Sequence, residues 1–193
     1  MNFQNAYFEG AAGTSASLLP CGLPEIVFSG KSNVGKSSMI NKLLNRKSLA
    51  HVASSPGKTA TVNFYNVGFC RFVDLPGYGY AKVPPEEKRR WAELVEGYFA
   101  AGRDIRLVVQ IVDMRRTPTE DDMAMIGFLR AKGFPFLLAA SKCDKLNTTE
   151  RRRQTVLLEE FSAKHGFGFL LFSAASGEGA EQLRKKILAA CRG

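Results

Sequence analysis

The sequence has little of what marks secreted, metal-bound or membrane proteins. Its four cysteines are scattered, no C-x-x-C pair occurs, and neither of the two histidines stands at a metal-ligand spacing from a cysteine. No apolar run approaches the ~18 residues of a membrane-spanning helix, and the first residues, MNFQNAYFE, lack a basic segment followed by an apolar core. We therefore expect a reduced, cytoplasmic protein without a secretion signal or membrane insertion.

Acidic side chains are fewer than basic ones. Lys and Arg number 27 against 18 Asp and Glu, a formal net charge of +9, which favours a polyanionic partner such as RNA, DNA or an anionic membrane. The 193 residues, 45% of them hydrophobic, suffice for one well-cored domain and are too few for two of ordinary size. We expect a monomer with a partly ordered edge segment at residues 1–22 and a single domain at residues 23–193.

Residues 24–38, PEIVFSGKSNVGKSS, predict a buried strand, a glycine-bounded loop and a helix starting at Ser37. The loop has the spacing of a phosphate-binding P-loop. Gly30 and Gly35 let the backbone point successive N–H groups at phosphate oxygens, Lys36 reaches the outer phosphates, and the Ser37 hydroxyl can ligate Mg²⁺. A chance glycine turn would not explain the strand, the helix and the Lys-Ser pair together.

Strand and helix patterns alternate along the rest of the chain. A hairpin is predicted from strands at residues 61–67 and 70–73, after a loop at residues 46–60 that is long enough to be a nucleotide switch. The alternation predicts an α/β fold in three layers, with a six-stranded, mainly parallel sheet, one antiparallel edge strand and helices on both faces. Further strands are expected at residues 107–112, 136–140 and 167–172, and further helices from Pro84 to Phe99, around 123–129, at 150–165 and around 183–188.

Two loops after predicted strands carry candidate ligands of a nucleotide. The Asp74 carboxylate can bind Mg²⁺ through a water molecule, and the Gly77 amide can sense a γ-phosphate. A helix-capping Asp followed by a turn Gly would give the same sequence pattern. In the run Ser141 to Asp144, the Lys142 stem can lie along a purine. Asp144 can accept hydrogen bonds from the ring N–H and the exocyclic amine that guanine has and adenine lacks. This pattern favours GTP over ATP, with a solvated turn as the alternative.

The series GKSNVGKS, PGKT, DLPG, SKCD and SAA looks like that of the translation-factor-type GTPases. More narrowly, PEIVFSGKSNVGKSSMINKLLNR, SSPGKTATVNFYNV and RFVDLPGYGYAKVP resemble the YihA/EngB (YsxC) family of bacterial ribosome-assembly GTPases, in the TrmE-Era-EngA-EngB-Septin-like superfamily. The likeness extends over nearly the whole chain from about Leu23. It implies a Ras-like P-loop GTPase fold, Mg²⁺ and GTP or GDP as cofactors, and a role in assembling the large ribosomal subunit on its rRNA. It also implies a need for the protein in normal division septum formation.

The resemblance assigns roles to residues by position. Ser37 and Thr59 become Mg²⁺ ligands, Asp74 acts on Mg²⁺ through water, and Asn33 becomes a ligand of K⁺. Thr61 competes with Thr59, but its place in a strand pattern favours a structural role. Lys36, Thr59 and Gly77 are the candidate catalytic residues. The candidate GTP-binding residues are Gly30, Lys31, Ser32, Asn33, Val34, Gly35, Lys36, Ser37, Ser38, Gly57, Lys58, Thr59, Ala60, Thr61, Asp74, Leu75, Pro76, Gly77, Ser141, Lys142, Cys143, Asp144, Ser173, Ala174 and Ala175.

Two departures from the wider GTPase pattern affect the expected activity. Ser141 stands where the familiar guanine motif has Asn, which alters one contact to the base or P-loop. Tyr78 follows Gly77 where Ras-like proteins have a water-orienting Gln, so we expect slow intrinsic hydrolysis by in-line attack of water. The alternatives are an RNA-binding or division-associated scaffold with a structural nucleotide site, and an ATP-dependent small-molecule kinase, which would leave SKCD and PGKT unexplained.

Four basic clusters are candidates for rRNA contact. Each taken singly also fits a solvated helix face, and the sequence does not say whether they share one surface. The clusters are Lys88-Arg89-Arg90, Arg115-Arg116, Arg151-Arg152-Arg153 and Lys185-Lys186.

Overall fold

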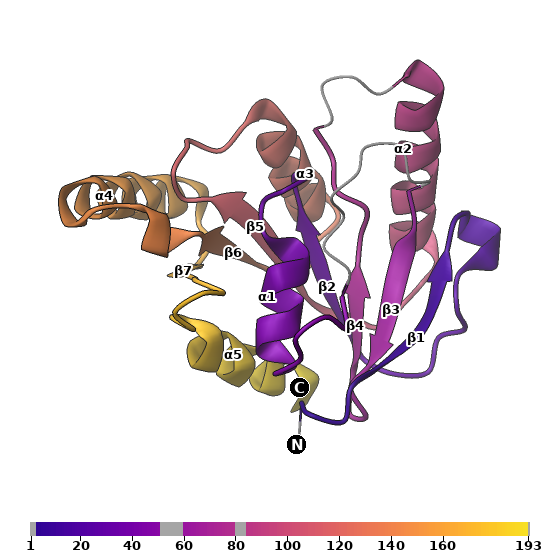
Figure 1. Cartoon of the computed structure of the whole chain (residues 1–193). Coiled ribbons are helices and arrows are strands. Elements are labelled where there is room, and N and C mark those ends of the chain that lie inside the picture. The colour runs from indigo at the N-terminus through magenta and orange to yellow at the C-terminus, as the bar shows by residue number, and fades with distance from the viewer. Residues whose placement is uncertain (1–2, 51–59, 80–83, 193) are drawn as a thin grey trace.

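The computed structural model describes residues 3–50, 60–79 and 84–192 as one sheet covered by helices (Figure 1). Within these residues the sheet has seven strands in the order β1-β3-β4-β2-β5-β6-β7. The strands are β1 Tyr7–Ala12, β2 Glu25–Gly30, β3 Val62–Asn66, β4 Arg71–Asp74, β5 Ile105–Asp113, β6 Phe136–Ser141 and β7 Phe169–Leu171. The helices are α1 Lys36–Leu43, α2 Pro85–Ala100, α3 Glu120–Ala131, α4 Thr148–His165 and α5 Ala180–Arg192, with short 3₁₀ helices η1 Ser15–Ser17 and η2 Cys143–Lys145.

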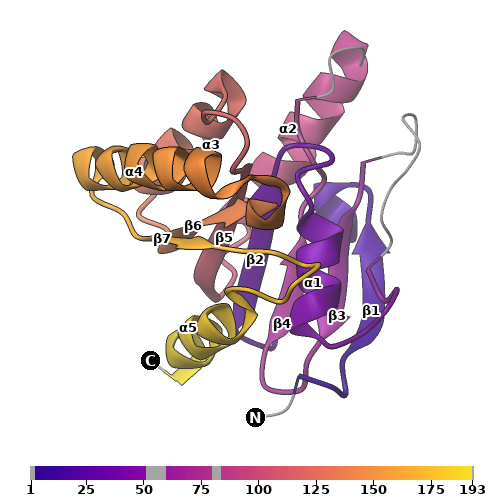
Figure 2. The same cartoon turned by 60° about the vertical axis from the view of Figure 1, so that its left-hand side comes forward.

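Helices cover both faces of the sheet, which confirms the predicted three-layer α/β class. Helices α1 and α5 pack on one face, while α2, α3 and α4 pack on the other (Figures 1 and 2). The central strand β2 is buried along its whole length and runs parallel to both β4 and β5. Its nearly continuous apolar run follows from this position, because a strand covered on two faces has no solvent side for polar residues.

The sheet differs from the prediction at one edge. The predicted hairpin is present, since β3 pairs antiparallel with β4, but the predicted number of six strands is wrong. The seventh strand, β1, pairs antiparallel with β3 and takes the edge. Its sequence, YFEGAA, is rich in small residues and its register shifts between Phe8 and Gly10, so it has no clean period-two pattern for sequence reasoning to detect.

Parallel strands bring their following loops to one edge of the sheet. Strands β2, β4, β5, β6 and β7 run in the same direction and therefore all end at the same edge of the sheet. Open α/β sheets bind ligands beyond these carboxyl ends. The fold therefore places every predicted nucleotide loop of the described residues at the same edge.

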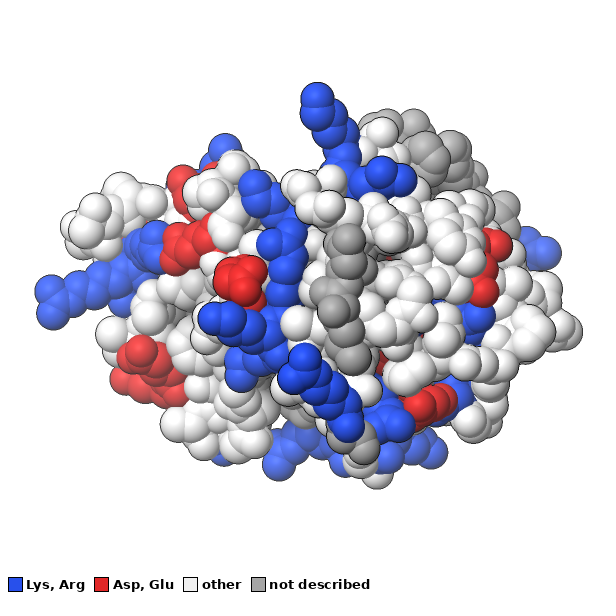
Figure 3. All heavy atoms as spheres, turned by 90° about the horizontal axis from the view of Figure 1, so that it is seen from below, with Lys and Arg blue, Asp and Glu red and all other residues white. Residues whose placement is uncertain are grey.

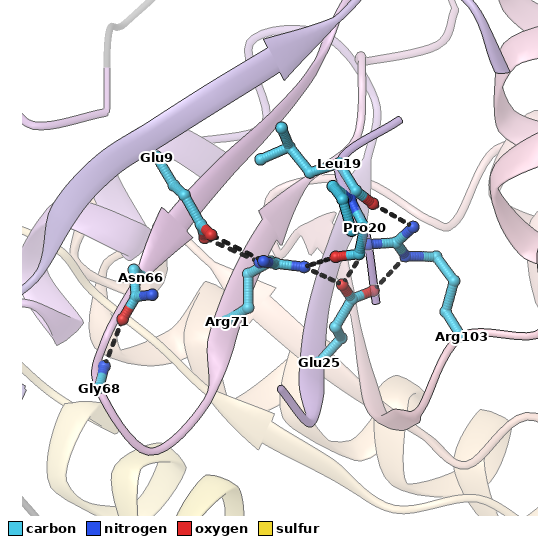
Figure 4. Close-up of polar contacts among 8 residues, drawn as sticks. All are labelled: Glu9, Leu19, Pro20, Glu25, Asn66, Gly68, Arg71 and Arg103. Carbon is cyan, nitrogen blue, oxygen red and sulfur yellow. Dashed lines mark hydrogen bonds and ion pairs between the residues drawn. The ribbon is translucent and has the colours of Figure 1, made fainter. Parts of the chain in front are cut away.

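A buried ionic cluster closes the opposite edge, where β2 and β4 begin (Figure 4). Glu25 is 1% exposed and accepts hydrogen bonds from Arg103 at 2.7 and 2.8 Å, from Arg71 at 3.2 Å and from the Tyr98 hydroxyl at 2.6 Å. Arg71 also forms a bidentate pair with Glu9 of β1, at 2.7 and 2.8 Å. We name these five residues the Glu25 cluster.

The same arginines fasten the chain between β1 and β2. The Arg71 guanidinium donates to the Pro20 carbonyl and that of Arg103 donates to the Leu19 carbonyl, each at 2.9 Å. Residues 9–20 are thus bound to the sheet by charge-assisted hydrogen bonds, which are stronger than neutral ones. In the part of the chain that the structure describes, no helix is both long and apolar enough to cross a membrane.

Candidate functional site

The loop after β2 has the backbone that phosphate binding requires. Asn33 and Gly35 have positive φ angles of 62° and 101°, so the loop turns tightly before α1, which begins at Lys36, one residue earlier than predicted. At Gly30 an added Cβ would lie 2.8 Å from the Ile111 carbonyl oxygen and 2.9 Å from a Val34 methyl carbon. Only glycine fits there, because real Cβ atoms do not approach other atoms so closely.

Lys36, predicted to bind phosphate, and Asp74, predicted to bind Mg²⁺ through water, are in contact in the structure. Asp74, the last residue of β4, is 4% exposed, and its Oδ1 pairs with the Lys36 ammonium. Burial raises the pKa of Asp74 above its ordinary value, and the charge of Lys36 opposes that rise. The ion pair joins the start of α1 to the end of β4 at the carboxyl edge of the sheet.

The oxygen donors near this pair fit Mg²⁺. Ser37 stands in the first turn of α1 and Asp74 at the end of β4, and Mg²⁺ favours oxygen ligands, keeping waters and taking phosphate oxygens to complete its six positions. No group of three or more His, Cys, Asp or Glu that could hold a metal occurs among the described residues. A magnesium site here therefore depends on the phosphates of a nucleotide, and the roles of Ser37 and Asp74 stay predictions.

Part of the predicted switch lies outside the described residues, namely Gly57, Lys58 and Thr59. Ala60 and Thr61 are half-buried just before β3. The Thr61 hydroxyl donates to Asn63 Oδ1 at 3.3 Å, a local contact at the start of the strand.

The loop after β6 is bound directly to the P-loop. The Ser141 hydroxyl, at the position where other GTPases have Asn, donates to the Val34 carbonyl at 2.6 Å. Lys142 has a positive φ of 61°, and its ammonium donates to the Asn33 carbonyl at 2.7 Å and to Asp113 Oδ2 at 3.1 Å. The altered position thus keeps a contact to the P-loop, and the two loops form one rigid wall.

Asp113, at the end of β5, is a site residue that sequence reasoning recognised only as a strand terminus. Its carboxylate accepts from the Arg115 guanidinium at 2.7 and 2.9 Å as well as from Lys142. Burial alone would raise the pKa of Asp113, but the hydrogen bonds from Arg115 and Lys142 outweigh it and lower the pKa to about 2. Its strand-end position was the available signal, because polar residues there face the ligand edge.

The predicted base-reading residues lie together at the ends of β6 and β7. Asp144 is exposed, and its Oδ1 accepts a hydrogen bond from the buried Ser173 hydroxyl at 2.7 Å. That bond lowers the pKa of Asp144, so its carboxylate stays charged and keeps accepting. Cys143 is buried beside Glu178. In the loop after β7, Ala174 is half-buried and Ala175 is exposed.

The Gly77 loop packs tightly on the P-loop. A Cβ on Gly77 would lie 3.0 to 3.1 Å from atoms of Ser32, and the Tyr78 carbonyl accepts hydrogen bonds from the Ser32 amide at 2.9 Å and hydroxyl at 3.0 Å. The Tyr78 side chain is 7% exposed and donates its hydroxyl proton to Asp122. The tyrosine is engaged inside the fold, which agrees with the expectation that it does not orient an attacking water.

Comparison with known families and proteins gives concordant matches. A family model described as 50S ribosome-binding GTPase matches residues 25–142. A probable GTP-binding protein EngB of Halothermothrix orenii is 47% identical over 173 residues, which cover 86% of this chain and 84% of that protein. A protein of the same description from Geobacter sulfurreducens is 46% identical over 189 residues, covering 97% of this chain and 91% of the relative.

Solved structures agree with these matches. A crystal structure of a probable GTP-binding protein EngB has a TM-score of 0.70 at 25% identity, covering 87% of this chain and 98% of that one. The structure of Era with MgGDPNP and a segment of 16S ribosomal RNA has a TM-score of 0.65 at 21% identity, covering 89% of this chain and 57% of that one. At that identity, the second likeness shows the fold alone.

Proposed function

We propose, because this chain belongs to the EngB family of GTP-binding proteins, that it is a Mg²⁺-dependent GTPase acting as a switch in large-subunit ribosome assembly. It works as a cytoplasmic monomer, and its function is needed for normal division septum formation. The GTP form docks on a precursor of the large ribosomal subunit, and hydrolysis to GDP and phosphate releases it.

The observation that carries this proposal is the meeting of four loops at one sheet edge. Lys36 and Asp74 are in contact, the Gly77 loop is bonded to the P-loop at Ser32, and Lys142 is bonded to the P-loop at Asn33. The loop after β7 joins them through the hydrogen bond from Ser173 to Asp144. These contacts join the predicted phosphate and base sites into a single surface. A nucleotide can therefore meet the phosphate-binding lysine, the γ-phosphate sensor and the guanine-reading loop at once.

The catalytic step rests on charge stabilisation and positioning. Lys36 and the loop amides stabilise negative charge on the phosphates, and the Gly77 amide holds the γ-phosphate in line with the attacking water. Mg²⁺, when bound through Ser37 and the water-linked Asp74, would neutralise further charge on the phosphates. The Tyr78 hydroxyl is bonded to Asp122, and we expect intrinsic hydrolysis to be slow because Tyr78, the residue after Gly77, does not orient the water.

A monovalent cation is a further proposed component. Asn33 is exposed in the P-loop with a left-handed backbone, and its side-chain amide oxygen can ligate K⁺ beside the phosphates. We expect GTP turnover to be faster in K⁺ than in Na⁺, and Asn33→Ala to abolish the difference. Equal rates of the unaltered protein in the two salts would rule out the cation.

The charge distribution supports RNA as the partner. Helix α5 adjoins the end of α1, because Arg184 donates hydrogen bonds to the Leu43 and Lys42 carbonyls at 2.9 Å. Seen from below, Lys and Arg side chains extend across this end of the molecule, with fewer acids between them (Figure 3). We name as the α1–α5 basic face the basic residues of α5, of the last turn of α1 and of the segment that follows it, namely Lys42, Arg46, Lys47, Arg184, Lys185, Lys186 and Arg192.

The remaining basic clusters lie elsewhere in the fold. Residues 88–90 are in the first turns of α2, residues 115–116 follow β5 at the nucleotide edge, and residues 151–153 are on α4. Because the α1–α5 basic face draws on two chain segments, it is the best candidate for a phosphate backbone.

Sedimentation of cell lysate through a density gradient tests the switch. With a non-hydrolysable GTP analogue, we expect the protein to co-sediment with precursors of the large subunit, and with GDP we expect it at the top of the gradient. The scaffold alternative predicts the same distribution with both nucleotides. An unrelated cytoplasmic GTPase in the same lysate controls for general effects of the nucleotide on the particles.

A further inference from the structure

The buried Tyr78 side chain makes a ring contact as well as hydrogen bonds inside the fold. Its ring meets the Trp91 ring edge-on, with centroids 6.1 Å apart, and the Trp91 indole N–H donates to the Pro76 carbonyl at 2.9 Å. The two aromatic side chains thereby fix Pro76 and Tyr78, the neighbours of Gly77, which is the residue expected to sense the γ-phosphate. Neither aromatic side chain has a role in the function proposed above.

The Tyr78 hydroxyl has two directed hydrogen bonds. It donates to Asp122 Oδ1 at 2.6 Å and accepts from the Gln110 side-chain amide at 2.5 Å. The second oxygen of Asp122 accepts from the backbone N–H and the hydroxyl of Thr119, both at 2.8 Å, in the capping box of α3. The tyrosine thus joins the Gly77 loop to the centre of β5 and to the first turn of α3.

Gln110 is fixed in one orientation by this arrangement. Its carbonyl oxygen is the single buried side-chain polar atom among the described residues without a hydrogen-bond partner, a costly condition. With the amide reversed, that oxygen would compete with Asp122 for the only hydroxyl proton of Tyr78. The observed orientation gives the proton to Asp122, and burial beside Asp122 raises the pKa of Tyr78 so that the proton is kept.

The backbone of Tyr78 completes the connection to the phosphate site. Its carbonyl accepts from both the amide and the hydroxyl of Ser32 in the P-loop. A displacement of the tyrosine ring would therefore move Gly77 relative to Ser32. The α- and β-phosphates are bound by the P-loop itself, so such a displacement affects mainly the γ-phosphate.

We propose that Tyr78 is a positioning residue that fixes the Gly77 amide against the P-loop through Asp122 and Gln110, and so sets the preference for GTP over GDP. This inference rests on the proposed function. It goes further by assigning the discrimination between the two nucleotides to a buried hydroxyl that touches neither of them.

The chain contains a matched control. Tyr98 is also a buried tyrosine, and its hydroxyl also donates to a buried carboxylate at 2.6 Å, that of Glu25. This second bond ends on the first residue of β2, at the opposite end of the strand from the nucleotide loops. Tyr78→Phe and Tyr98→Phe therefore remove the same kind of bond, and only the first removes it beside the site.

The experiment compares the affinities of the two variants for GDP and for a non-hydrolysable GTP analogue, by isothermal titration calorimetry with Mg²⁺. For Tyr78→Phe we expect the affinity for the analogue to fall about tenfold, the loss typical of a hydrogen bond to a charged group, and GDP affinity to stay within about twofold. kcat/KM for GTP should fall with the analogue affinity. Tyr98→Phe should lower the urea midpoint while keeping both affinities.

A second variant tests the same role in case Tyr78→Phe does not fold. Asp122→Asn leaves one uncharged oxygen where the carboxylate has two, so Tyr78 and Thr119 must compete for a single acceptor. We expect a loss of about threefold in the analogue affinity alone. An unchanged ratio of analogue to GDP affinity, or an equal loss of both, would overturn the role of Tyr78. If the unaltered protein bound neither nucleotide, the proposed function itself would fail instead.

Discussion

Asp144, the residue proposed to read the base, is an exposed carboxylate. Its side chain accepts one hydrogen bond, from the Ser173 hydroxyl, and forms a weak ion pair with Lys145 at 3.5 Å. Because two hydrogen bonds from guanine would end on this carboxylate, we expect it to provide the discrimination against adenine. Ser173 would act on the base through Asp144 and should matter less.

Replacing Asp144 tests the base preference. We expect Asp144→Asn to weaken GDP binding about 100-fold, because an amide offers one acceptor where the carboxylate offers two charged ones. Ser173→Ala should weaken it about threefold. Competition against a fluorescent GDP measures both, with Lys145→Ala as the control that keeps affinity. Displacement of the probe by ATP as readily as by GTP would refute the role of Asp144.

Asp113 makes stability depend on pH. Its folded pKa of about 2 lies below the ~3.9 of an unfolded Asp, so its stabilisation is complete above about pH 4 and disappears as the pH falls toward 2. We expect Asp113→Asn to lower the free energy of unfolding at pH 7 by about 1 kcal/mol, after solvent screening of Arg115.

Urea unfolding at pH 7, 4 and 3 measures this effect. The variant should approach the stability of the unaltered protein as the pH falls. A stability difference that is the same at all three pH values would contradict the assignment. Arg116→Ala, next to the pairing arginine but in none of the ion pairs recorded for the described residues, is the control.

At the scale of elements, the turn from β2 into α1 depends on close approach of backbones. Gly30→Ala places a methyl against the Ile111 carbonyl, which belongs to β5 and cannot move aside. We expect GDP binding to weaken at least about 100-fold, since the P-loop must shift by a fraction of an ångström from phosphate-binding geometry. Gly127→Ala on the exposed side of α3 has open space and should raise stability by about 0.5–1 kcal/mol.

Calorimetric titration and thermal unfolding distinguish these two glycines. Retained nucleotide affinity in Gly30→Ala would show that the loop adapts, contrary to the expectation. The comparison separates a glycine required by its surroundings from one that only weakens a helix.

The Glu25 cluster stabilises the elements at the other edge of the sheet. We expect Glu25→Gln to lower the free energy of unfolding by about 3 kcal/mol, because it leaves the buried Arg103 guanidinium without a charge partner. Glu9→Gln should cost about 1 kcal/mol, since Glu9 is partly exposed and Arg71 keeps Glu25. Urea unfolding followed by circular dichroism measures both, and equal costs would contradict the central place of Glu25. Nucleotide affinity should not change.

The elements differ in how far the sequence predicts them. Strands β2, β5 and β6 follow from apolar runs, and the four nucleotide loops follow from the predicted ends of β2, β4, β6 and β7. Strand β1 and the Glu25 cluster do not, because partners such as Glu25 and Arg103 are 78 positions apart and no local pattern records their pairing. The Tyr78 contacts to Gln110 and Asp122 escaped prediction for the same reason, being 32 and 44 positions apart.

At the scale of the whole molecule, the α1–α5 basic face extends to the loop that follows β7. A Cβ added at Gly177 of this loop would lie 3.0 Å from Cε of Lys42. Lys185 and Lys186 belong to α5 itself, and we expect these two residues to contribute most to RNA binding.

Charge reversal on this face tests its role. We expect Lys185→Glu with Lys186→Glu to weaken binding to large-subunit rRNA and to reduce the slope of log affinity against log salt by about 2, one for each lost phosphate contact. Filter binding over a salt series measures the slope. Arg152→Glu with Arg153→Glu on α4 is the matched control, and an equal reduction there would contradict the choice of face.

The position of the Glu25 cluster along the chain has a consequence for synthesis. Its five members, from Glu9 to Arg103, all belong to the first 103 residues. As the chain leaves the ribosome, the cluster can close once Arg103 has emerged, while β6, α4, β7 and α5 are still to come. Strands β1 to β4 would then form a template whose free edge at β2 receives β5, β6 and β7 in the order of their translation.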